Sequence, residues 1–300
     1  MSYRAKALVS KEISWILDGC GEGAVLLSTS KGVYYQCGGH VLMLTDARFG
    51  LTPIGIGLED LPRVVSALSI QNGQPVTLRN RTLQFPGGTL TLEIEIVPQT
   101  LPAGAPIPQK VRDCATVLYA RHKHRGVSVF SAPLLLGKNT EALDTGLHRV
   151  AYPLLSKLLD SLREGHHDAV DYAVSQLVGL GVGLTPSLDD CLLGMLYGLL
   201  RTAPESRATR MLKDAVIKYA PGGTHEISAA YLKAVAEGAP FGRLDSVLRG
   251  LSGEIPLDIE PVLEIGSSSG SEMLLGLLLA VNICAAGNST ERGALCNTLN

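Results

Sequence analysis

A segment rich in proline and small residues divides this chain into two parts with different hydrophobic patterns. It spans residues 101–108 and reads Leu-Pro-Ala-Gly-Ala-Pro-Ile-Pro. Before it, apolar and polar residues alternate over short stretches, which is typical of β-strands. After it, apolar residues recur three and four positions apart, which is typical of amphipathic helices. We therefore expect an α+β protein, with one domain over residues 1–105 and another over residues 106–300.

The first part is expected to be a small antiparallel sandwich or barrel. Its clearest strand is 90–97, where Leu90, Leu92, Ile94 and Ile96 face one way and the residues between them are polar. Turn signals rich in glycine, proline and asparagine separate the strands. The expected strands are 24–28, 33–37, 41–44, 76–78, 82–85 and 90–97.

The second, larger part is expected to be mostly helical and to pack against the first. Pro153 falls inside one of the predicted helices and is expected to kink or split it, because proline lacks the N–H group that a helix interior needs. The expected helices are 109–123, 140–163, 167–178, 187–202, 205–219, 225–237, 241–251 and 269–286.

Composition excludes several classes of function. The chain is 46% hydrophobic and 18% charged, with a net charge of −2, which argues against binding to nucleic acid or an anionic membrane surface. The six cysteines are scattered without a CxxC pair, as in a cytoplasmic protein with reduced thiols. No signal peptide or membrane-spanning segment is expected. Low charge with leucine-rich helices favours a partner subunit, which could be a second copy of the chain.

A glycine-rich loop at residues 179–186 leads into the predicted helix 187–202. The first turn of that helix carries Ser187, Asp189 and Asp190. Helix N-termini expose unpaired N–H groups and a partial positive charge, so such a loop can bind an anion. Two adjacent carboxylates can instead bind a cation.

A second loop, at residues 263–272, repeats this arrangement before the predicted helix 269–286. Both helices carry small residues four positions apart, Gly194 with Gly198 and Gly276 with Ala280. Glycine inside a helix costs about 1 kcal/mol relative to alanine, and a close crossing of the two helices would explain it. We therefore expect these helices to pack together and to bring their polar N-termini to one pocket. The alternative is a pair of core helices with ordinary capping residues.

Three other polar segments carry side chains that could bind a ligand. Thr224 and His225 follow Gly222 and Gly223 and could either donate to a ligand or cap a helix. The basic cluster 121–125 is interpreted as cations that complement the partial negative charge of a helix C-terminus. The pair His166 and His167 is interpreted as the solvent-exposed start of a helix and not as a metal site. No metal-ligand spacing and no cofactor motif is present, so neither a metal nor a cofactor is predicted.

Three segments together, 181–190, 224–232 and 266–276, resemble signatures of the AllH-like family. The resemblance covers most of the chain and is strongest from about residue 179. It implies a subunit of oxamate carbamoyltransferase, an enzyme of allantoin degradation and so of purine catabolism. The reaction is oxalurate plus phosphate giving oxamate plus carbamoyl phosphate, or the reverse. FdrA-like and AllG-like subunits are the implied partners, and the resemblance does not assign the chemistry to one subunit.

The resemblance and the helix N-termini together give a set of site residues. The expected catalytic residues are Asp189, Asp190 and Thr224. The expected substrate or anion-binding residues are Gly183, Thr185, Ser187, Ser268, Ser269 and Gly270. The hydroxyl groups would donate hydrogen bonds to a small anion, and the carboxylates would orient them or hold a cation.

Three positions depart from the family pattern. Leu188 stands where relatives tend to have glycine, which is expected to place a bulky side chain near the ligand. Ser267 and Glu272 stand where relatives usually have histidine and aspartate, and the loss of histidine removes a possible cationic contact. These departures favour a different substrate or a purely structural role. Two alternatives therefore stay open: a structural or regulatory subunit without catalysis, and an independent metal-dependent enzyme using Asp189 and Asp190.

Overall fold

A computed structural model describes residues 1–99, 101–139 and 145–296, with side chains described as far as residue 284. The chain divides into two compact units. The first contains Met1–Thr100 with Glu237–Arg243, and the second contains Leu101–Ala236 with Leu244–Asn300. The first is built from strands and the second from helices, which confirms the expected α+β class.

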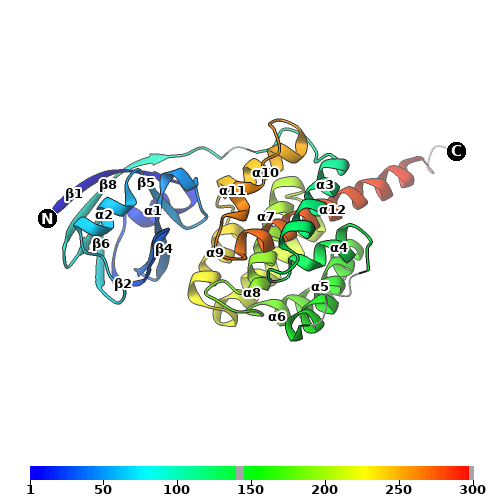
Figure 1. Cartoon of the computed structure of the whole chain (residues 1–300), viewed down its shortest axis with the longest axis horizontal. Helices are drawn as coiled ribbons and strands as arrows, with labels where there is room; N and C mark the ends of the chain where they lie inside the picture. The colour runs from blue at the N-terminus through cyan, green and yellow to red at the C-terminus, as the bar shows by residue number, and fades with distance from the viewer. Residues whose placement is uncertain (100, 140–144, 297–300) are drawn as a thin grey trace. The chain divides into compact units, whose positions relative to one another are not determined.

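The first unit is a closed barrel of eight strands (Figure 1). Around the barrel the strands follow the order β1, β5, β4, β3, β2, β6, β7 and β8. The strand bounds are β1 Ser2–Val9, β2 Cys20–Ser28, β3 Gly32–Cys37, β4 His40–Asp46, β5 Gly55–Leu58, β6 Pro75–Arg79, β7 Thr82–Phe85 and β8 Gly88–Ile96.

Two of the strand pairings in the barrel are parallel, whereas the sequence led us to expect only antiparallel ones. β1 pairs with β8 in parallel, with Ser2 opposite Thr89 and Val9 opposite Ile96. β4 pairs with β5 in parallel, because the chain returns through the short 3-10 helix η1 (Ala47–Phe49) before β5 begins. The remaining pairings are antiparallel.

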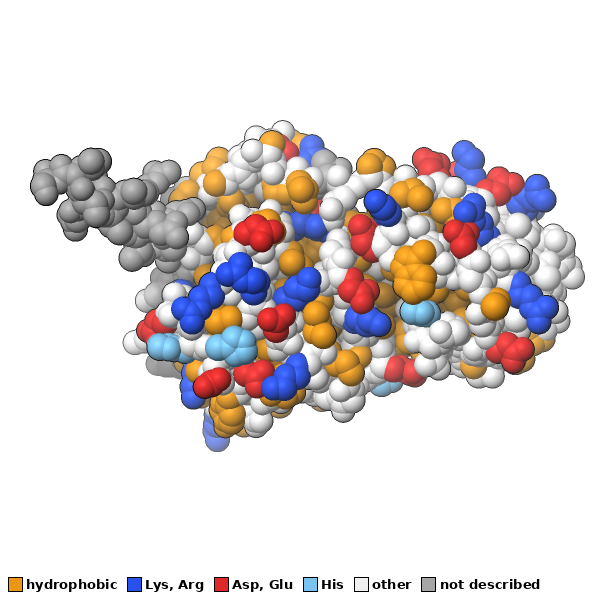
Figure 2. Space-filling view, turned by 180° about the vertical axis from the view of Figure 1, so that it is seen from behind, with side chains coloured by type: hydrophobic (Ala, Val, Ile, Leu, Met, Phe, Trp, Pro, Cys, Tyr) orange, Lys and Arg blue, Asp and Glu red, His pale blue; other side chains and the backbone are white. Residues whose placement is uncertain are grey.

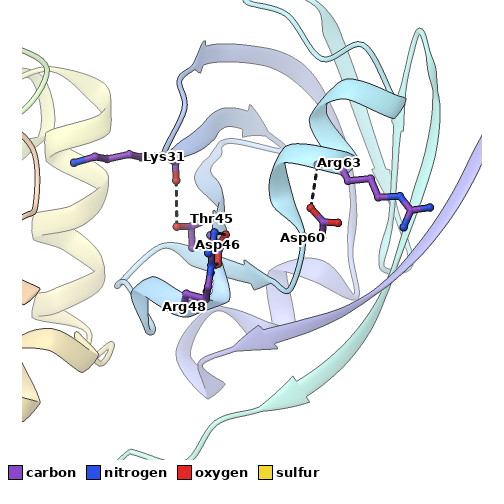
Figure 3. Close-up of polar contacts among 6 residues, drawn as sticks. All are labelled: Lys31, Thr45, Asp46, Arg48, Asp60 and Arg63. Carbon is purple, nitrogen blue, oxygen red and sulfur yellow. Dashed lines mark hydrogen bonds and ion pairs between the residues drawn. The ribbon is translucent and has the colours of Figure 1, made fainter.

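The barrel is filled by alternate residues of its strands. In β8, Leu90 and Leu92 are buried as predicted, but Ile96 at the end of the strand is 52% exposed. Short helices join the strands: α1 (Lys11–Leu17) and α2 (Leu61–Ala67). Aspartates cap two of the connections (Figure 3). Asp46 accepts the backbone N–H of Arg48 at 2.9 Å, and Asp60 accepts that of Arg63 at 3.2 Å.

The second unit is helical, and most predicted helices lie within a few residues of their expected bounds (Figure 1). Pro153 was expected to kink or split a helix, and it does not split one, because α5 runs through it without a break. In α8 the backbone is not helical at Pro221 and Gly222. The bounds are α3 Pro108–His122, η2 Ser128–Phe130, α4 Ser131–Leu135, α5 Gly146–Glu164, α6 His167–Leu177, α7 Ser187–Thr202, α8 Arg207–Gly223, α9 Glu226–Ala236, α10 Gly242–Ser252, α11 Glu260–Leu263 and α12 Ser269–Cys296.

Helices α7 and α12 form the centre of this unit and cross at very short range. A Cβ atom at Gly194 would overlap the carbonyl oxygen of Met273, and one at Gly276 would overlap that of Cys191. A Cβ atom at Gly198 would lie 2.7 Å from that of Ala280. The predicted crossing through small residues is therefore confirmed. Within the described residues, no helix combines the length and the apolar character needed to cross a membrane.

Candidate functional site

The crossing of α7 and α12 brings the two Gly/Ser loops into contact. Thr185 precedes α7, Ser269 is the first residue of α12, and their hydroxyl oxygens lie 3.2 Å apart. These residues are 84 positions apart in the chain. The expectation that the two polar N-termini meet at one place is therefore confirmed at the level of side-chain contact.

Asp190 lies beneath this contact and accepts hydrogen bonds from both loops. Thr185 donates to its Oδ2 atom at 3.0 Å, and Ser269 also donates to it. The residue is 1% exposed. Burial raises the pKa of Asp190 well above its usual value, and the nearby charge of Glu272 raises it further, while the two hydroxyls oppose the shift.

Asp189 faces a different set of partners and joins three segments of the chain. The Gly179 N–H and the Ser228 hydroxyl each donate to its carboxylate at 2.7 Å, and Thr224 donates as well. Burial raises the pKa of Asp189, although these hydrogen bonds favour its ionised form. Asp189 thus connects the first glycine-rich loop, the segment between α8 and α9, and α9 itself.

Glu272 is the third buried carboxylate of the site. It accepts hydrogen bonds from Ser268, at 3.2 Å to Oε2, and from Ser187 in the first turn of α7. Burial raises its pKa. Its Oε1 atom lies against Gly126, where a Cβ atom would overlap it unless the Glu272 side chain shifted. The backbone of Gly126 also has a positive φ of 49°.

The expected hydroxyl donors therefore point at carboxylates of this chain. A hydroxyl has a single proton to donate, and each of these five donates to Asp189, Asp190 or Glu272 or shares its hydrogen bond with a neighbour that does. The residues concerned are Thr185, Ser187, Thr224, Ser268 and Ser269. This arrangement makes them positioning groups for the carboxylates.

Backbone donors differ between the two helix N-termini. At α7 the N–H groups of Leu188, Asp189 and Asp190 are used within the loop, on the carbonyls of Leu180 and Pro186. At α12 the N–H groups of residues 267–269 donate to no other group in the described part of the chain. The N-terminus of α12 thus offers more unused N–H donors than that of α7 and is the better anion-binding site.

Arg125 adds a positive charge at the same end of α12. Its guanidinium donates to the carbonyl of Ser267 at 3.1 Å, and the side chain is exposed. The basic cluster was predicted only to complement a helix C-terminus, and Arg121 and His122 do lie in the last turn of α3. The role of Arg125 at the second loop was missed. Its only sequence signal is the adjacent Gly126, and nothing local connects that glycine to Glu272.

The other predicted site residues lie as follows. Gly183 is exposed in the first loop, with a positive φ of 100°. Gly270 is buried, and a Cβ atom there would overlap the carbonyl of Val262 in α11. The side chain of Leu188, which was expected near the ligand, is fully buried. Ser267 is exposed at the loop.

The described residues contain no preformed metal-binding site. Across residues 1–99, 101–139 and 145–284, no group of three or more histidine, cysteine, aspartate or glutamate side chains is arranged to hold a metal ion. His166 lies 3.0 Å from Glu164 on the surface, and His225 accepts the N–H of Ile227 at 3.3 Å. These histidines therefore contribute to local structure.

Fold and site together define a two-part α+β protein, with a barrel and a helical unit whose central helices present paired Gly/Ser loops. Residues 177–281 match the model of the family described as oxamate carbamoyltransferase subunit AllH. The matched segment contains both loops and supports an AllH-like assignment for this part of the chain. No solved structure matches the chain.

Proposed function

We propose that this chain is a non-autonomous subunit of an oxamate carbamoyltransferase-type complex in allantoin degradation, and that its two Gly/Ser loops form the substrate site. One observation carries the proposal: the matched segment 177–281 spans both loops and the Thr224 segment. The contact between Thr185 and Ser269 supports treating them as one site. FdrA-like and AllG-like chains are the proposed partners.

The anionic part of the substrate would bind at the start of α12. Oxalurate, oxamate, phosphate and carbamoyl phosphate are all anions. The N–H groups of residues 267–269 and the guanidinium of Arg125 are donors without a competing carboxylate partner among the described residues. A helix N-terminus with a neighbouring arginine suits such a group electrostatically.

Asp190 would move a proton during the transfer. When an oxygen of hydrogen phosphate attacks the carbamoyl carbon of oxalurate, the bond from that carbon to the oxamate nitrogen breaks. The leaving nitrogen must gain a proton and the attacking phosphate must lose one. A carboxyl group with a raised pKa can accept and return that proton near neutral pH. Because Asp190 is 1% exposed, the proton would pass through the hydroxyl of Thr185 or Ser269, which lie nearer the surface.

The test is reconstitution with FdrA-like and AllG-like subunits, followed by an assay of phosphate-dependent oxamate release from oxalurate. The variant Asp190→Asn is expected to assemble but to lose activity by about 100-fold to 10,000-fold, the usual range for a lost acid–base group. Asp214→Asn, which changes an exposed carboxylate on α8, is the matched control and should retain activity. Full activity of an assembled Asp190→Asn complex would contradict a catalytic role.

A second candidate is a structural or regulatory subunit without catalysis. The observation that favours it is the burial of Asp189, Asp190 and Glu272, each 1% exposed and each holding hydroxyls of its own chain. In this case Asp190→Asn should lower assembly of the complex, with activity proportional to the amount of complex formed. Size-exclusion chromatography beside the activity assay separates the two candidates.

A further inference from the structure

A cavity of about 480 Å³ lies in the helical unit, away from the Gly/Ser loops. It is lined by the last residues of α7, the middle of α12, the first turn of α3 and the segment before α3. Its α7 residues, Arg201 and Thr202, lie more than ten positions beyond Asp190, which is about 15 Å or more along a helix. Its volume is typical of small-molecule sites, which span roughly 300–1,000 Å³.

The charge of the lining is positive. Arg112 and Arg201 line the cavity, and no aspartate or glutamate is among the lining residues. Arg201 has a side chain that is only 6% exposed, and it is fixed by an ion pair with Asp245 at 3.5 Å and by stacking on Tyr197 at 4.5 Å. Arg112 is exposed in α3, and its charge has no ion-pair partner among the described residues.

The start of α3 strengthens this positive field. Pro108, Val111 and Arg112 line the cavity, and the first turn of the 15-residue helix carries no acidic residue and no side-chain cap. Its dipole therefore places positive potential toward the cavity. The carboxylate of Glu254 lies beside the cavity wall, where it accepts the N–H of the lining residue Ala103, and its charge is compensated by an ion pair with Arg249 at 3.1 Å.

The rest of the lining is mixed, because Thr202, Asn282 and Cys284 line the cavity beside apolar side chains. The apolar side chains come from the segment before α3 and from α3, α4 and α12, namely Pro102, Ala103, Ala105, Pro106, Pro108, Val111, Leu135 and Val281. An arginine-bearing end beside an apolar wall is complementary to a ligand with one anionic head and a short hydrocarbon body.

We propose that this cavity is a second ligand site, which binds a small organic monocarboxylate. The carboxylate lies at Arg112 and the first turn of α3, and the hydrocarbon lies against the apolar wall. The site is separate from the two loops of the proposed carbamoyl-transfer site, and its occupation requires neither turnover nor partner subunits.

Isothermal titration of the full chain tests the proposal, with a series of straight-chain monocarboxylates from acetate to octanoate. Each acid is compared with its uncharged primary amide. Affinity is expected to increase roughly threefold per added methylene group until the cavity is full, since each buried methylene adds a hydrophobic contribution. Each acid is expected to bind at least about tenfold more tightly than its amide, because a charge-assisted hydrogen bond to the arginine is lost in the amide.

Two variants locate the binding. Arg112→Gln should weaken carboxylate binding by about tenfold, and Ala105→Phe should abolish binding of the longer acids by filling the cavity. Both positions are exposed, so unchanged melting temperatures are expected. Arg149→Gln is the matched control, because it removes an exposed arginine on α5 that does not line the cavity.

Three outcomes would overturn the proposal: no acid binds at millimolar concentration, the amides bind as tightly as the acids, or binding is the same in Arg112→Gln and Ala105→Phe as in the parent chain. None of these outcomes bears on the carbamoyl-transfer proposal, because the titration contains no carbamoyl substrate and no second subunit.

Discussion

Asp190 is one of three buried carboxylates in this site that lower the stability of the folded chain. Its carboxylate and those of Asp189 and Glu272 are buried, and burial raises the pKa of all three. Removing ionised groups from water costs free energy, and hydroxyl hydrogen bonds from the two loops offset only part of that cost. A chain that retains three such groups in its core is stabilised less than one with apolar residues there. This cost favours a role for them beyond packing.

The pH dependence of stability is a prediction at this scale. In the unfolded chain Asp190 titrates near pH 4, and in the folded chain its pKa is raised. Between the two pKa values the folded state holds more protons, so increasing pH lowers the free energy of unfolding. Asn cannot lose a proton. Asp190→Asn should therefore gain stability relative to the parent chain as the pH rises above the unfolded pKa of the aspartate.

Urea denaturation at pH 5, 6, 7 and 8 measures this difference. The comparison uses the change with pH and not the stability at one pH, because the amide also alters the hydrogen bonds from Thr185 and Ser269. Asp214→Asn is the control and should follow the parent chain at every pH, since Asp214 is exposed on α8. A constant offset between Asp190→Asn and the parent chain would mean that Asp190 titrates normally in the folded state.

At the scale of elements, the sequence predicts most helices because the helical spacing of their apolar residues extends over many residues. The pairing of α7 with α12 could also be predicted, because both carry small residues at the same spacing. Two strands were missed for local reasons. β1 faces inward partly through Ala5 and Ala7, which are weak strand formers, and β5 contains two glycines in four residues. Short helices such as α4 and α11 are too brief to show a period.

The site could be predicted only in part for a related reason. Loop and helix signals identify Thr185, Asp190 and Ser269 as polar residues at helix starts. They do not identify Gly126 and Arg125, whose roles depend on contacts with residues about 140 positions away. They also do not say whether a hydroxyl donates to a ligand or to a carboxylate of the same chain, because that choice depends on the geometry of packing.

The crossing of α7 and α12 gives a prediction at the element scale. In most helices Gly→Ala stabilises by about 1 kcal/mol. At Gly194 the sign is expected to reverse, because the added Cβ atom overlaps the carbonyl oxygen of Met273 and the helices must separate. We expect Gly194→Ala to destabilise the chain by roughly 2–4 kcal/mol, comparable with overpacking of a core, as measured by urea denaturation.

Gly146→Ala is the control for that measurement. Gly146 is the first residue of α5, and a Cβ atom there meets nothing within 4 Å. It should be neutral or slightly stabilising. If Gly194→Ala behaves like Gly146→Ala, then α7 and α12 do not cross as closely as described.

For the molecule as a whole, surface charge agrees with the low net charge of the sequence. On the face shown in Figure 2, lysine and arginine side chains are interspersed with aspartate and glutamate, and apolar side chains lie between them. Several large apolar residues are strongly exposed in the helical unit, including Val150 at 54% and Tyr172 at 53%. Such residues are available for contacts with the other subunits of the proposed complex.

We also predict that residues 1–105 form an independent domain. The buried residues of the barrel core, from Ala7 to Leu92, all lie within the first hundred residues, so the barrel has a core of its own. A fragment of residues 1–105 should therefore show a β-rich circular dichroism spectrum and a single cooperative thermal transition. A fragment that is unfolded or aggregated under the same conditions would show that the barrel depends on the helical unit.

The parallel pairing of β1 with β8 sets the order in which the barrel can be completed. β1 leaves the ribosome first, but both of its neighbours, β5 and β8, are made later. Until residue 96 has been synthesised, the edges of β1 and β8 cannot meet, and unpaired strand edges invite association between chains. Closure of the barrel is thus a late, long-range step in the biogenesis of this protein. A shortened N-terminus would leave β5 and β8 as permanent open edges.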